Sequence, residues 1–300
     1  MIFVSRSSVR ISFCGGGTDI SPYPEEHSGC VISTTINKYV TSTFEPLPGK
    51  TNIINCREGE RKLISAVLRR MGRTGKVTIN SDIAPQSGLG NSAAATVSLL
   101  GLFVADKPKN EIAELAYKIE KVDLKNKGGK QDQYASVFGG LNFIEFNGGT
   151  NVKVTPLKIK NKKQLERNLL LVNVGKRTNS GDIIKTYNHT VEFLDKTKEI
   201  TIEMKKQLLR GNLNSFGKLL GEAWEYKKLF TPQMTNNYIE SIYETALKNG
   251  AFGKVQGAGG GGHMLFYCND KQKVKRALQK YNVNFVDFNF EKSGLQVKKL

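Results

Sequence analysis

The sequence contains little histidine, little cysteine and no long apolar run. Its three histidines, His27, His189 and His263, are not spaced i,i+4, and its four cysteines form no Cys-x-x-Cys pair. A zinc site built from these side chains is therefore not expected. Four scattered cysteines are also too few for a disulfide framework in a chain of 300 residues, and we expect them to be reduced and packed.

No stretch of about 18 apolar residues occurs, and the first residues lack the basic and then apolar order of an export signal. We therefore expect a cytoplasmic protein without a membrane segment. An apolar content of 39% is enough to bury a substantial core, which argues against disorder and allows one large domain or two ordinary ones. We expect a monomer or a homodimer.

Negative charge is scarce, because 45 Lys and Arg residues outnumber 27 Asp and Glu residues and give a net charge of +18. A field of this sign attracts nucleic acids, acidic lipids and small polyanions. The lysines lie along helix-like segments without interleaved aromatic residues, and the densest group is at 158–163. This distribution indicates a solvated surface rather than a nucleic-acid site. Retention on heparin that is lost at modest salt would favour nucleic acid instead.

Strand patterns dominate the first part of the chain. Alternating and β-branched residues predict strands at 9–13, 31–44, 51–56, 77–81 and 141–146, with helices at 63–71, at 91–104 and from Pro108. Beyond Lys163 we predict a strand at 169–174, helices between 182 and 249, a glycine-rich turn, a strand at 263–267, a helix at 271–281 and strands at 285–290 and 295–298. This change of order suggests two domains, 1–163 and 164–300, each mixing strands and helices.

The most informative segment is the loop from Pro85 to Ser92, which joins a predicted strand to a predicted helix. Gly88 and Gly90 allow the backbone to approach a ligand closely, and the amides at the start of the helix favour an anion. We interpret this loop as a phosphate cradle. Asn91 and Ser92 are candidates to cap the helix, and the Ser92 hydroxyl is also a candidate Mg²⁺ ligand. A plain glycine turn before a capped helix is the alternative.

Three further segments combine glycine with polar residues. Residues 254–262 contain a G-x-G-x-x-G string, but a predicted strand follows it, which excludes a dinucleotide site and leaves a close approach to an anion or a hairpin turn. Residues 128–134 carry Asp132 in a predicted loop, where it is a candidate general base or oxyanion partner; a surface turn is the alternative. Near the N-terminus, Arg10 lies on a predicted strand that is followed by three glycines and Asp19, which again implies a close ligand.

Together these segments resemble the motifs of the GHMP small-molecule kinases, the superfamily of galactokinase, homoserine kinase, mevalonate kinase and phosphomevalonate kinase. The loop from Pro85 to Ala94 is similar to the second motif, a proline followed by G-L-G-S-S-A-A, with Asn91 in place of the first serine. Residues 254–262 resemble the glycine-rich third motif, and residues 10–19 resemble the N-terminal motif. Within the superfamily, the strings R-I-S-F-C-G-G-G-T-D, G-G-K-Q-D-Q-Y and N-F-I-E-F are most similar to the D-glycero-D-manno-heptose 7-phosphate kinases.

The resemblance implies a two-domain α+β fold, with an N-terminal mixed β/α domain that binds ATP and a ferredoxin-like C-terminal domain. It implies that Asp132 is catalytic, that Arg10 supports the reacting oxygens, and that Ser92 and Glu120 ligate Mg²⁺, although Asn91 leaves open which side chain meets the metal. Around the ATP phosphates it places Pro85, Ser87, Gly88, Leu89, Gly90, Asn91, Ser92 and Ala93. Around the sugar it places Gly16, Gly17, Thr18, Asp19, Gly257, Ala258, Gly259 and Gly260.

By analogy with heptose and galactose kinases, the acceptor is expected to be the anomeric hydroxyl, and heptose 7-phosphate would yield the 1,7-bisphosphate. A sugar that already carries phosphate needs a second cationic pocket, for which the segment around Arg177 is our candidate; an exposed basic turn is the alternative. Galactokinase-, fucokinase- or mevalonate-like acceptors remain open, as does a non-catalytic regulator that binds sugar or nucleotide. The joint presence of Asp132, Glu120 and Ser92 argues against the regulator.

Overall fold

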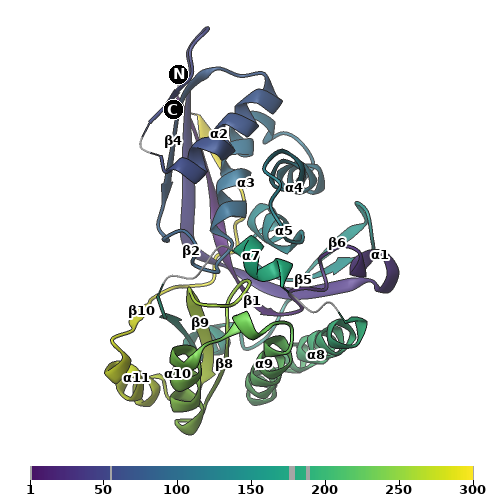
Figure 1. The fold of residues 1–300 in the computed structure, drawn as a ribbon, viewed down its shortest axis with the longest axis vertical. Helices are drawn as coiled ribbons and strands as arrows, with labels where there is room; N and C mark the ends of the chain where they lie inside the picture. Colours follow the sequence, from purple (N-terminus) through teal and green to yellow (C-terminus); the bar gives the residue numbers. More distant parts are fainter. Residues whose placement is uncertain (1, 55, 176–179, 187–189, 300) are drawn as a thin grey trace.

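The computed structural model describes residues 2–54, 56–175, 180–186 and 190–299. Two β-sheets with their helices form an upper and a lower part of the molecule (Figure 1). One sheet has seven strands and the other has four. No helix in these ranges is long and apolar enough to cross a membrane.

The elements of the upper part come first in the chain. They are β1 (Phe3–Cys14), α1 (Tyr23–His27), β2 (Gly29–Pro46), β3 (Asn52–Ile53), α2 (Glu58–Met71), β4 (Gly75–Ser81), α3 (Asn91–Val104), α4 (Lys109–Lys118), a π-helical turn (Ile119–Asp123), α5 (Gln131–Phe138), β5 (Leu141–Phe146) and β6 (Val152–Pro156). There follow α6 (Lys162–Asn168), β7 (Leu169–Asn173), α7 (Ser180–Lys185), α8 (Val191–Arg210), α9 (Leu213–Lys228), α10 (Asn237–Lys248), β8 (Ala251–Val255), β9 (His263–Cys268), α11 (Lys271–Leu278), β10 (Asn284–Val286) and β11 (Gln296–Lys299).

The larger sheet is built on two long antiparallel strands, β1 and β2. Its strands follow the order β11-β1-β2-β4-β3, and β2 also pairs with β5, which pairs with β6. Because one end of β2 pairs with β4 and the other with β5, the sheet divides into two arms. The register between β1 and β2 shifts between Ser8 and Arg10. Such irregularities bend a strand, re-aim its side chains and are frequent beside active sites.

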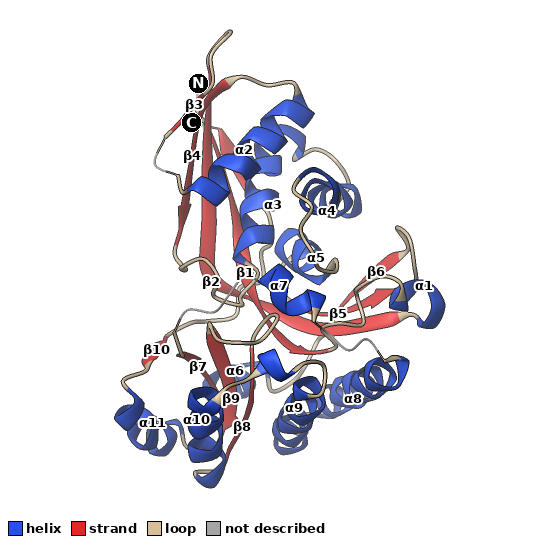
Figure 2. Cartoon of the chain, viewed as in Figure 1, coloured by secondary structure: helices blue, strands red, loops and turns tan. Residues whose placement is uncertain are grey.

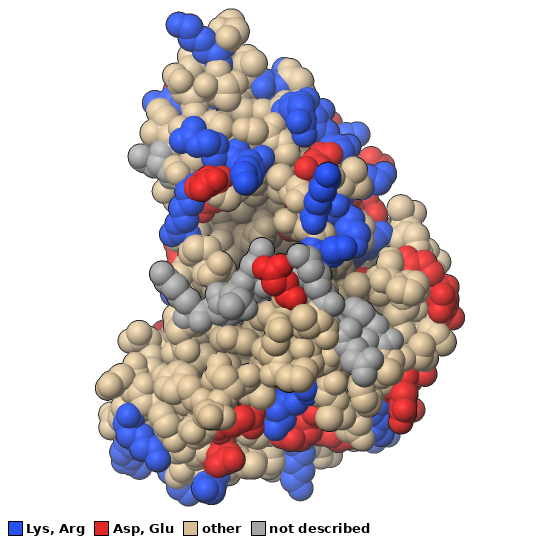
Figure 3. All heavy atoms as spheres, in the orientation of Figure 1, with Lys and Arg blue, Asp and Glu red and all other residues tan. Residues whose placement is uncertain are grey.

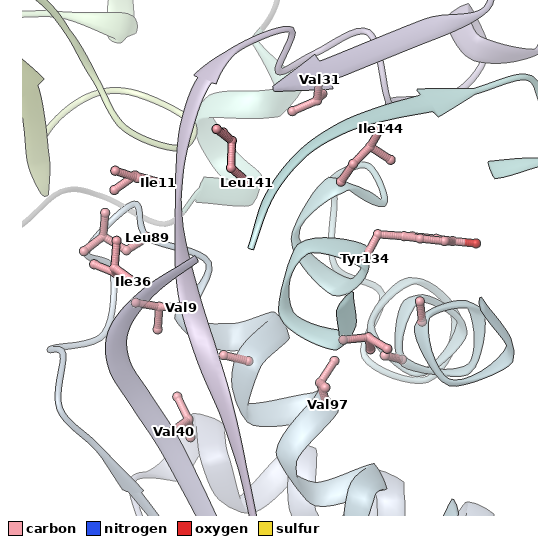
Figure 4. Close-up of a cluster of buried hydrophobic side chains, with 14 of the residues drawn as sticks. Val9, Ile11, Val31, Ile36, Val40, Leu89, Val97, Tyr134, Leu141 and Ile144 are labelled. Carbon is pink, nitrogen blue, oxygen red and sulfur yellow. The ribbon is translucent and has the colours of Figure 1, made fainter. Parts of the chain in front are cut away.

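Helices α2 to α5 lie on one side of the long strands (Figure 2). Helix α3 contacts both β1 and β2 as well as α4 and α5, and 11 of its 14 residues are buried. Figure 4 shows part of this core, to which the sheet contributes Val9 and Val40 and α3 contributes Val97. A helix that is apolar on all sides is buried, and its neighbours on every side fix its position. The packing therefore fixes the position of the N-terminal turn of α3.

The smaller sheet is antiparallel, with the order β10-β7-β9-β8. Helices α8, α9 and α10 lie between β7 and β8, and α11 lies between β9 and β10, which gives the β-α-β-β-α-β succession of ferredoxin-like folds. The predicted two-part α+β fold is confirmed. Strands β8 and β9 form a hairpin, and its connection contains the glycine-rich segment 256–262.

Several local predictions need correction, and helices α1 and α6 were not predicted. The segment around Asp132 is not a loop, because helix α5 begins at Gln131 and buries Tyr134 and Val137 one turn apart. Strands β6 and β8 were missed, since β6 is short and half polar and β8 carries Gly253 next to the glycine-rich run. Strand β11 returns to pair with β1 in the larger sheet. The domain boundary at Lys163 stays a prediction.

Candidate active site

A cleft of about 780 Å³ brings the four motif segments together. Its lining includes residues of β1 and the turn after it, of the β4–α3 loop, of the chain from Tyr117 to Gln133, and of the β8–β9 hairpin, and residues of α2, α7 and α9 complete it. Figure 3 shows this face hollowed between the two parts of the molecule, with Lys and Arg side chains gathered over α2 and α4 above the hollow. Segments that are far apart in the sequence therefore share one cavity.

Arg10 and Asp132 form a bidentate ion pair on the wall of this cleft. Nε of Arg10 donates to Oδ1 of Asp132 at 2.8 Å, and Nη2 donates to Oδ2 at 2.9 Å. Nη1 of Arg10 also donates to the Gly88 carbonyl oxygen at 2.6 Å. Arg10 is buried at the register shift of β1, and Asp132 lies in the first turn of α5. One guanidinium thus orients the Asp132 carboxylate against the glycine loop.

The glycine loop enters α3 without a side-chain cap. The N-cap residue is Gly90, with φ 73°, and no side chain of the described residues caps the helix with a hydrogen bond. The prediction that Asn91 or Ser92 caps α3 is wrong, because Gly90 occupies the cap position and Asn91 Oδ1 accepts from Ser81 Oγ at 2.6 Å. Gly90, Asn91, Ser92 and Ala93 all line the cleft. First-turn amides without a side-chain acceptor form an anion-binding site.

Glu120 points its carboxylate at the same helix start. It accepts hydrogen bonds from Ser92 Oγ at 3.1 Å, Thr96 Oγ1 at 3.0 Å and Gln133 Nε2 at 3.1 Å. Burial raises the pKa of Glu120, and the nearby charge of Asp132 adds to this effect. Thr96 and Gln133 were not predicted, although Thr96 lies one helical turn from Ser92 and therefore on the same face.

The Ser92 and Glu120 pair fits the chemistry of Mg²⁺. Among the described residues, the three hydrogen-bond partners of this buried carboxylate are neutral and supply no counter-charge, and one of them is the Ser92 hydroxyl. Mg²⁺ in kinases takes one or two carboxylates and completes its shell with water and phosphate oxygens. No cluster of three or more His, Cys, Asp or Glu side chains suited to a metal exists in the part of the chain that the structure describes. A metal held here would therefore depend on the nucleotide for further ligands.

Asp19 lies on the floor of the cleft beside Asp132. Its Oδ2 accepts from the Gln131 amide at 3.0 Å, and its Oδ1 accepts from Gln131 Nε2 at 3.0 Å and from the Gly17 amide at 3.1 Å. Gln131 Oε1 accepts from Ser12 Oγ at 3.2 Å. Burial raises the pKa of Asp19. The residue before Asp132 is thus tied to Asp19, in a polar network suited to sugar hydroxyls.

Not every predicted residue reaches the cleft. Thr18 is fully buried, and its hydroxyl is hydrogen-bonded to the main chain of Gly15 and Cys30. Leu89 belongs to the core, Gly259 and Gly260 lie outside the lining, and Arg177 lies outside the described residues. The predicted residues that line the cleft are Arg10, Gly16, Gly17, Asp19, Pro85, Ser87, Gly88, Gly90, Asn91, Ser92, Ala93, Glu120, Asp132, Gly257 and Ala258.

No sequence pattern predicted that Lys254 and Gln256 hold two parts of the site together. Nζ of Lys254 donates to the carbonyl oxygens of Ser12 and Phe13, at 3.2 Å each, and the Ser12 amide donates to Gln256 Oε1 at 2.8 Å. Burial lowers the pKa of Lys254 to about 8. These bonds join β8 and the glycine-rich connection to β1, next to Arg10. The hairpin therefore holds the strand that carries the ion pair.

Gly88→Ala is expected to raise the KM for ATP about tenfold or more. Gly88 has φ 81°, and a Cβ there would lie 2.5 Å from the carbonyl oxygen of Gln256, so the loop must shift. Strain of this kind costs roughly 1–3 kcal/mol, and about 1.4 kcal/mol corresponds to a factor of ten in affinity. Steady-state kinetics with ATP as the varied substrate measure the effect.

Gly149→Ala is the matched control for this substitution. Gly149 also has positive φ, 52°, but a Cβ there meets nothing within 4 Å. Its KM for ATP should stay at the parent value. Equal KM values for the two variants would show that close packing of Gly88 on the hairpin does not shape the nucleotide site.

Two family profiles match the chain. The profile of the GHMP kinases N terminal domain covers residues 60–140, and that of the GHMP kinases C terminal covers residues 204–287. A curated D-glycero-alpha-D-manno-heptose 7-phosphate kinase from Campylobacter jejuni is 31% identical over 97% of each chain. The chain belongs to the GHMP kinase family. As a GHMP kinase it is an ATP-dependent small-molecule kinase, and the resemblance seen in its motifs is confirmed.

Other GHMP kinases extend this comparison. A solved D-glycero-D-manno-heptose 1-phosphate kinase from Bacteroides thetaiotaomicron superposes with a TM-score of 0.80, at 31% identity and 99% coverage of both chains. The L-fucokinase/L-fucose-1-P guanylyltransferase of Bacteroides fragilis is 25% identical over 98% of this chain and 38% of its own length. A mevalonate kinase from Methanococcus jannaschii, at 20% identity and a TM-score of 0.70, shares the fold. The relatives support a GHMP sugar kinase.

Proposed function

We propose that this GHMP sugar kinase transfers the γ-phosphoryl group of Mg-ATP to the anomeric hydroxyl of D-glycero-D-manno-heptose 7-phosphate, giving the 1,7-bisphosphate. The observation that carries the proposal is the convergence in one cleft of the uncapped start of α3, the buried Glu120 and the oriented Asp132. The relative named as a heptose 7-phosphate kinase supports the choice of sugar.

In the proposed reaction the protein mainly aligns groups and neutralises charge. The amides of Gly90 to Ala93 hold the polyphosphate, and Ser92 and Glu120 would hold Mg²⁺, which when bound neutralises phosphate charge. Asp132 accepts the proton of the attacking hydroxyl, or only orients that hydroxyl, because a loose transition state requires little base strength. The sugar oxygen forms a bond to the γ-phosphorus while the bond to the β,γ-bridging oxygen breaks, and ADP leaves.

The remaining site residues have supporting roles in this proposal. Arg10 keeps Asp132 aimed at the acceptor and holds the loop carbonyl at Gly88. Asp19, positioned by Gln131, accepts hydrogen bonds from sugar hydroxyls. Gly16, Gly17, Gly257 and Ala258 complete the sugar side of the cleft. A cytoplasmic location and a phosphate-binding role for Arg177 remain predictions.

A panel of acceptors tests the proposal. The purified protein is incubated with Mg-ATP and heptose 7-phosphate, heptose 1-phosphate, free heptose, fucose, galactose or mevalonate. We expect the highest kcat/KM with heptose 7-phosphate and a new phosphorus resonance from a phosphate on the anomeric carbon. Faster turnover of fucose, galactose or mevalonate would assign the chain to another acceptor. ATP binding without turnover of any acceptor would favour a non-catalytic regulator.

A further inference from the structure

The basic residues that line the cleft fall into two groups. Arg10, Lys227 and Lys254 are buried and donate to Asp132 or to main-chain carbonyl oxygens. The other group lies at the rim and consists of Arg57, Lys62, Lys121, Lys125 and Lys127. Three of its members, Lys121, Lys125 and Lys127, come from one segment, residues 119–129, which consists of the π-helical turn and the chain that leads from it to α5.

Both ends of this segment are fixed in the active site. Glu120 lies at the first end, and its carbonyl oxygen accepts a hydrogen bond from the Asn126 amide at 2.9 Å. This bond holds the chain after the π-helical turn against Glu120. At the other end, Gly129 packs so tightly on Asp19 that a Cβ would lie 2.1 Å from its Oδ2. Turns of the π type are rare and are frequent at functional sites. The segment therefore runs along the cleft from Glu120 to Asp19.

The lysines of this segment are available to a ligand. The ammonium groups of Lys121, Lys125 and Lys127 make no hydrogen bond or ion pair with the residues that the structure describes. Lys125 has φ 54°, a left-handed conformation that is costly for a residue other than glycine. Residues held in such conformations cluster at active sites and ligand clamps.

We propose that Lys125 and Lys127 bind the phosphate that the acceptor sugar already carries, so that this segment selects sugar phosphates over free sugars. The proposal rests on the proposed function. Lys121 directly follows Glu120 and is farther along the chain from Gly129 than Lys125 and Lys127 are. Lys127 is two residues from Gly129, and two residues span at most about 7 Å of chain, which keeps it close to Asp19. A phosphate at the far end of a seven-carbon sugar would lie along this wall when its anomeric hydroxyl meets Asp132.

The buried cations do not offer an alternative phosphate site. Arg10 uses its guanidinium on Asp132 and Gly88, and Lys254 uses its ammonium group on Ser12 and Phe13. Exposed ammonium groups bind phosphate as point charges through charge-assisted hydrogen bonds. Salt screens such contacts at the surface, so each lysine should contribute modestly and the two should act together.

The test compares one sugar with and without its phosphate. The parent protein and the Lys125→Ala/Lys127→Ala variant are assayed with D-glycero-D-manno-heptose 7-phosphate and with the free heptose. We expect kcat/KM for the phosphorylated sugar to fall about 10- to 100-fold in the variant, because its KM rises. The kcat/KM for the free sugar and the KM for ATP should not change. Lys118→Ala/Lys153→Ala, which removes two exposed lysines that do not line the cleft, is the charge-matched control.

Three kinetic outcomes would overturn the proposal. The first is an equal fall in kcat/KM for the phosphorylated and the free sugar. The second is a rise in the KM for ATP while the preference for the phosphorylated sugar stays intact, and the third is a parent protein that prefers the free sugar. The proposal would also be overturned if Arg177→Ala lost the preference for the phosphorylated sugar and the double variant kept it. If the parent phosphorylates no sugar, the proposed function fails. Calorimetric titration of heptose 7-phosphate then decides the lysine proposal, since equal binding by parent and double variant contradicts it.

Discussion

Asp132→Asn is expected to lower kcat by about 10²-fold or more while the KM for ATP changes little, in line with the usual contribution of general acid–base groups. Asparagine keeps the size of the side chain but cannot accept a proton from the sugar hydroxyl. It also weakens the bidentate pair with Arg10, which aims the group at the acceptor. The nucleotide phosphates are held by the amides of α3, so ATP binding should persist. Steady-state kinetics and calorimetric binding of a non-hydrolysable ATP analogue measure the two quantities.

Asp123→Asn provides the control for losing a bidentate pair. Asp123 accepts from Nε and Nη2 of Arg70 at 2.8 and 2.7 Å, and it does not line the cleft. Both substitutions remove the same kind of ion pair, but only the one at Asp132 should slow turnover. Near-normal kcat in Asp132→Asn would refute the catalytic assignment. Equal losses in the two variants would mean that folding rather than chemistry was affected, which melting temperatures check.

Glu120→Gln is expected to raise the Mg²⁺ concentration needed for half-maximal activity about 10²-fold or more. The substitution removes a charged ligand, and loss of a group that only supports a ligand already costs about 10- to 100-fold. Glutamine can still accept hydrogen bonds from Thr96 and Gln133, so the pocket should keep its shape. Titration of activity with Mg²⁺ at saturating ATP measures the effect. An unchanged Mg²⁺ requirement would remove Glu120 from the metal site.

The same variant should be as stable as the parent, or more stable, at neutral pH without Mg²⁺. Burial raises the pKa of Glu120 above its value in the unfolded chain, so the folded protein binds more protons in the window between the two values. The parent's free energy of unfolding therefore falls as pH rises through that window, and glutamine abolishes this fall. Because only the ionised form ligates a metal, the parent should also need more Mg²⁺ as pH falls through the same window.

Glu114→Gln is the contrasting control for stability. Glu114 is also largely buried, but Lys130 Nζ donates to its two carboxylate oxygens at 2.7 and 2.8 Å, and the Tyr134 hydroxyl donates at 2.8 Å. Removing one partner of a buried pair leaves an uncompensated charge and destabilises the protein. Glu114→Gln should therefore lower the melting temperature and leave the Mg²⁺ requirement unchanged. A melting temperature that rises in Glu120→Gln and falls in Glu114→Gln would distinguish a functional carboxylate from a structural one.

The sequence by itself determined much of the local structure. Apolar periodicity placed the long strands and the helix at 91–104, because side-chain direction repeats every two residues in a strand and every 3.6 in a helix. Gly88 and Gly90 indicated a close backbone approach, and both have positive φ. The resemblance to the family motifs pointed to Arg10 and Asp132 as residues of the site. These features depend on a few neighbouring residues, which is why a linear pattern reveals them.

Only the tertiary structure decided which side chains meet. Arg10 and Asp132 are 122 positions apart and pair because β1 and α5 pack side by side. Asn91 turns to Ser81, while Ser92 faces Glu120. Such pairings depend on the rotation of a helix against a sheet and on where distant strands end, which no local pattern contains. The sequence determines which functional groups the chain contains. Long-range packing determines which of these groups come into contact.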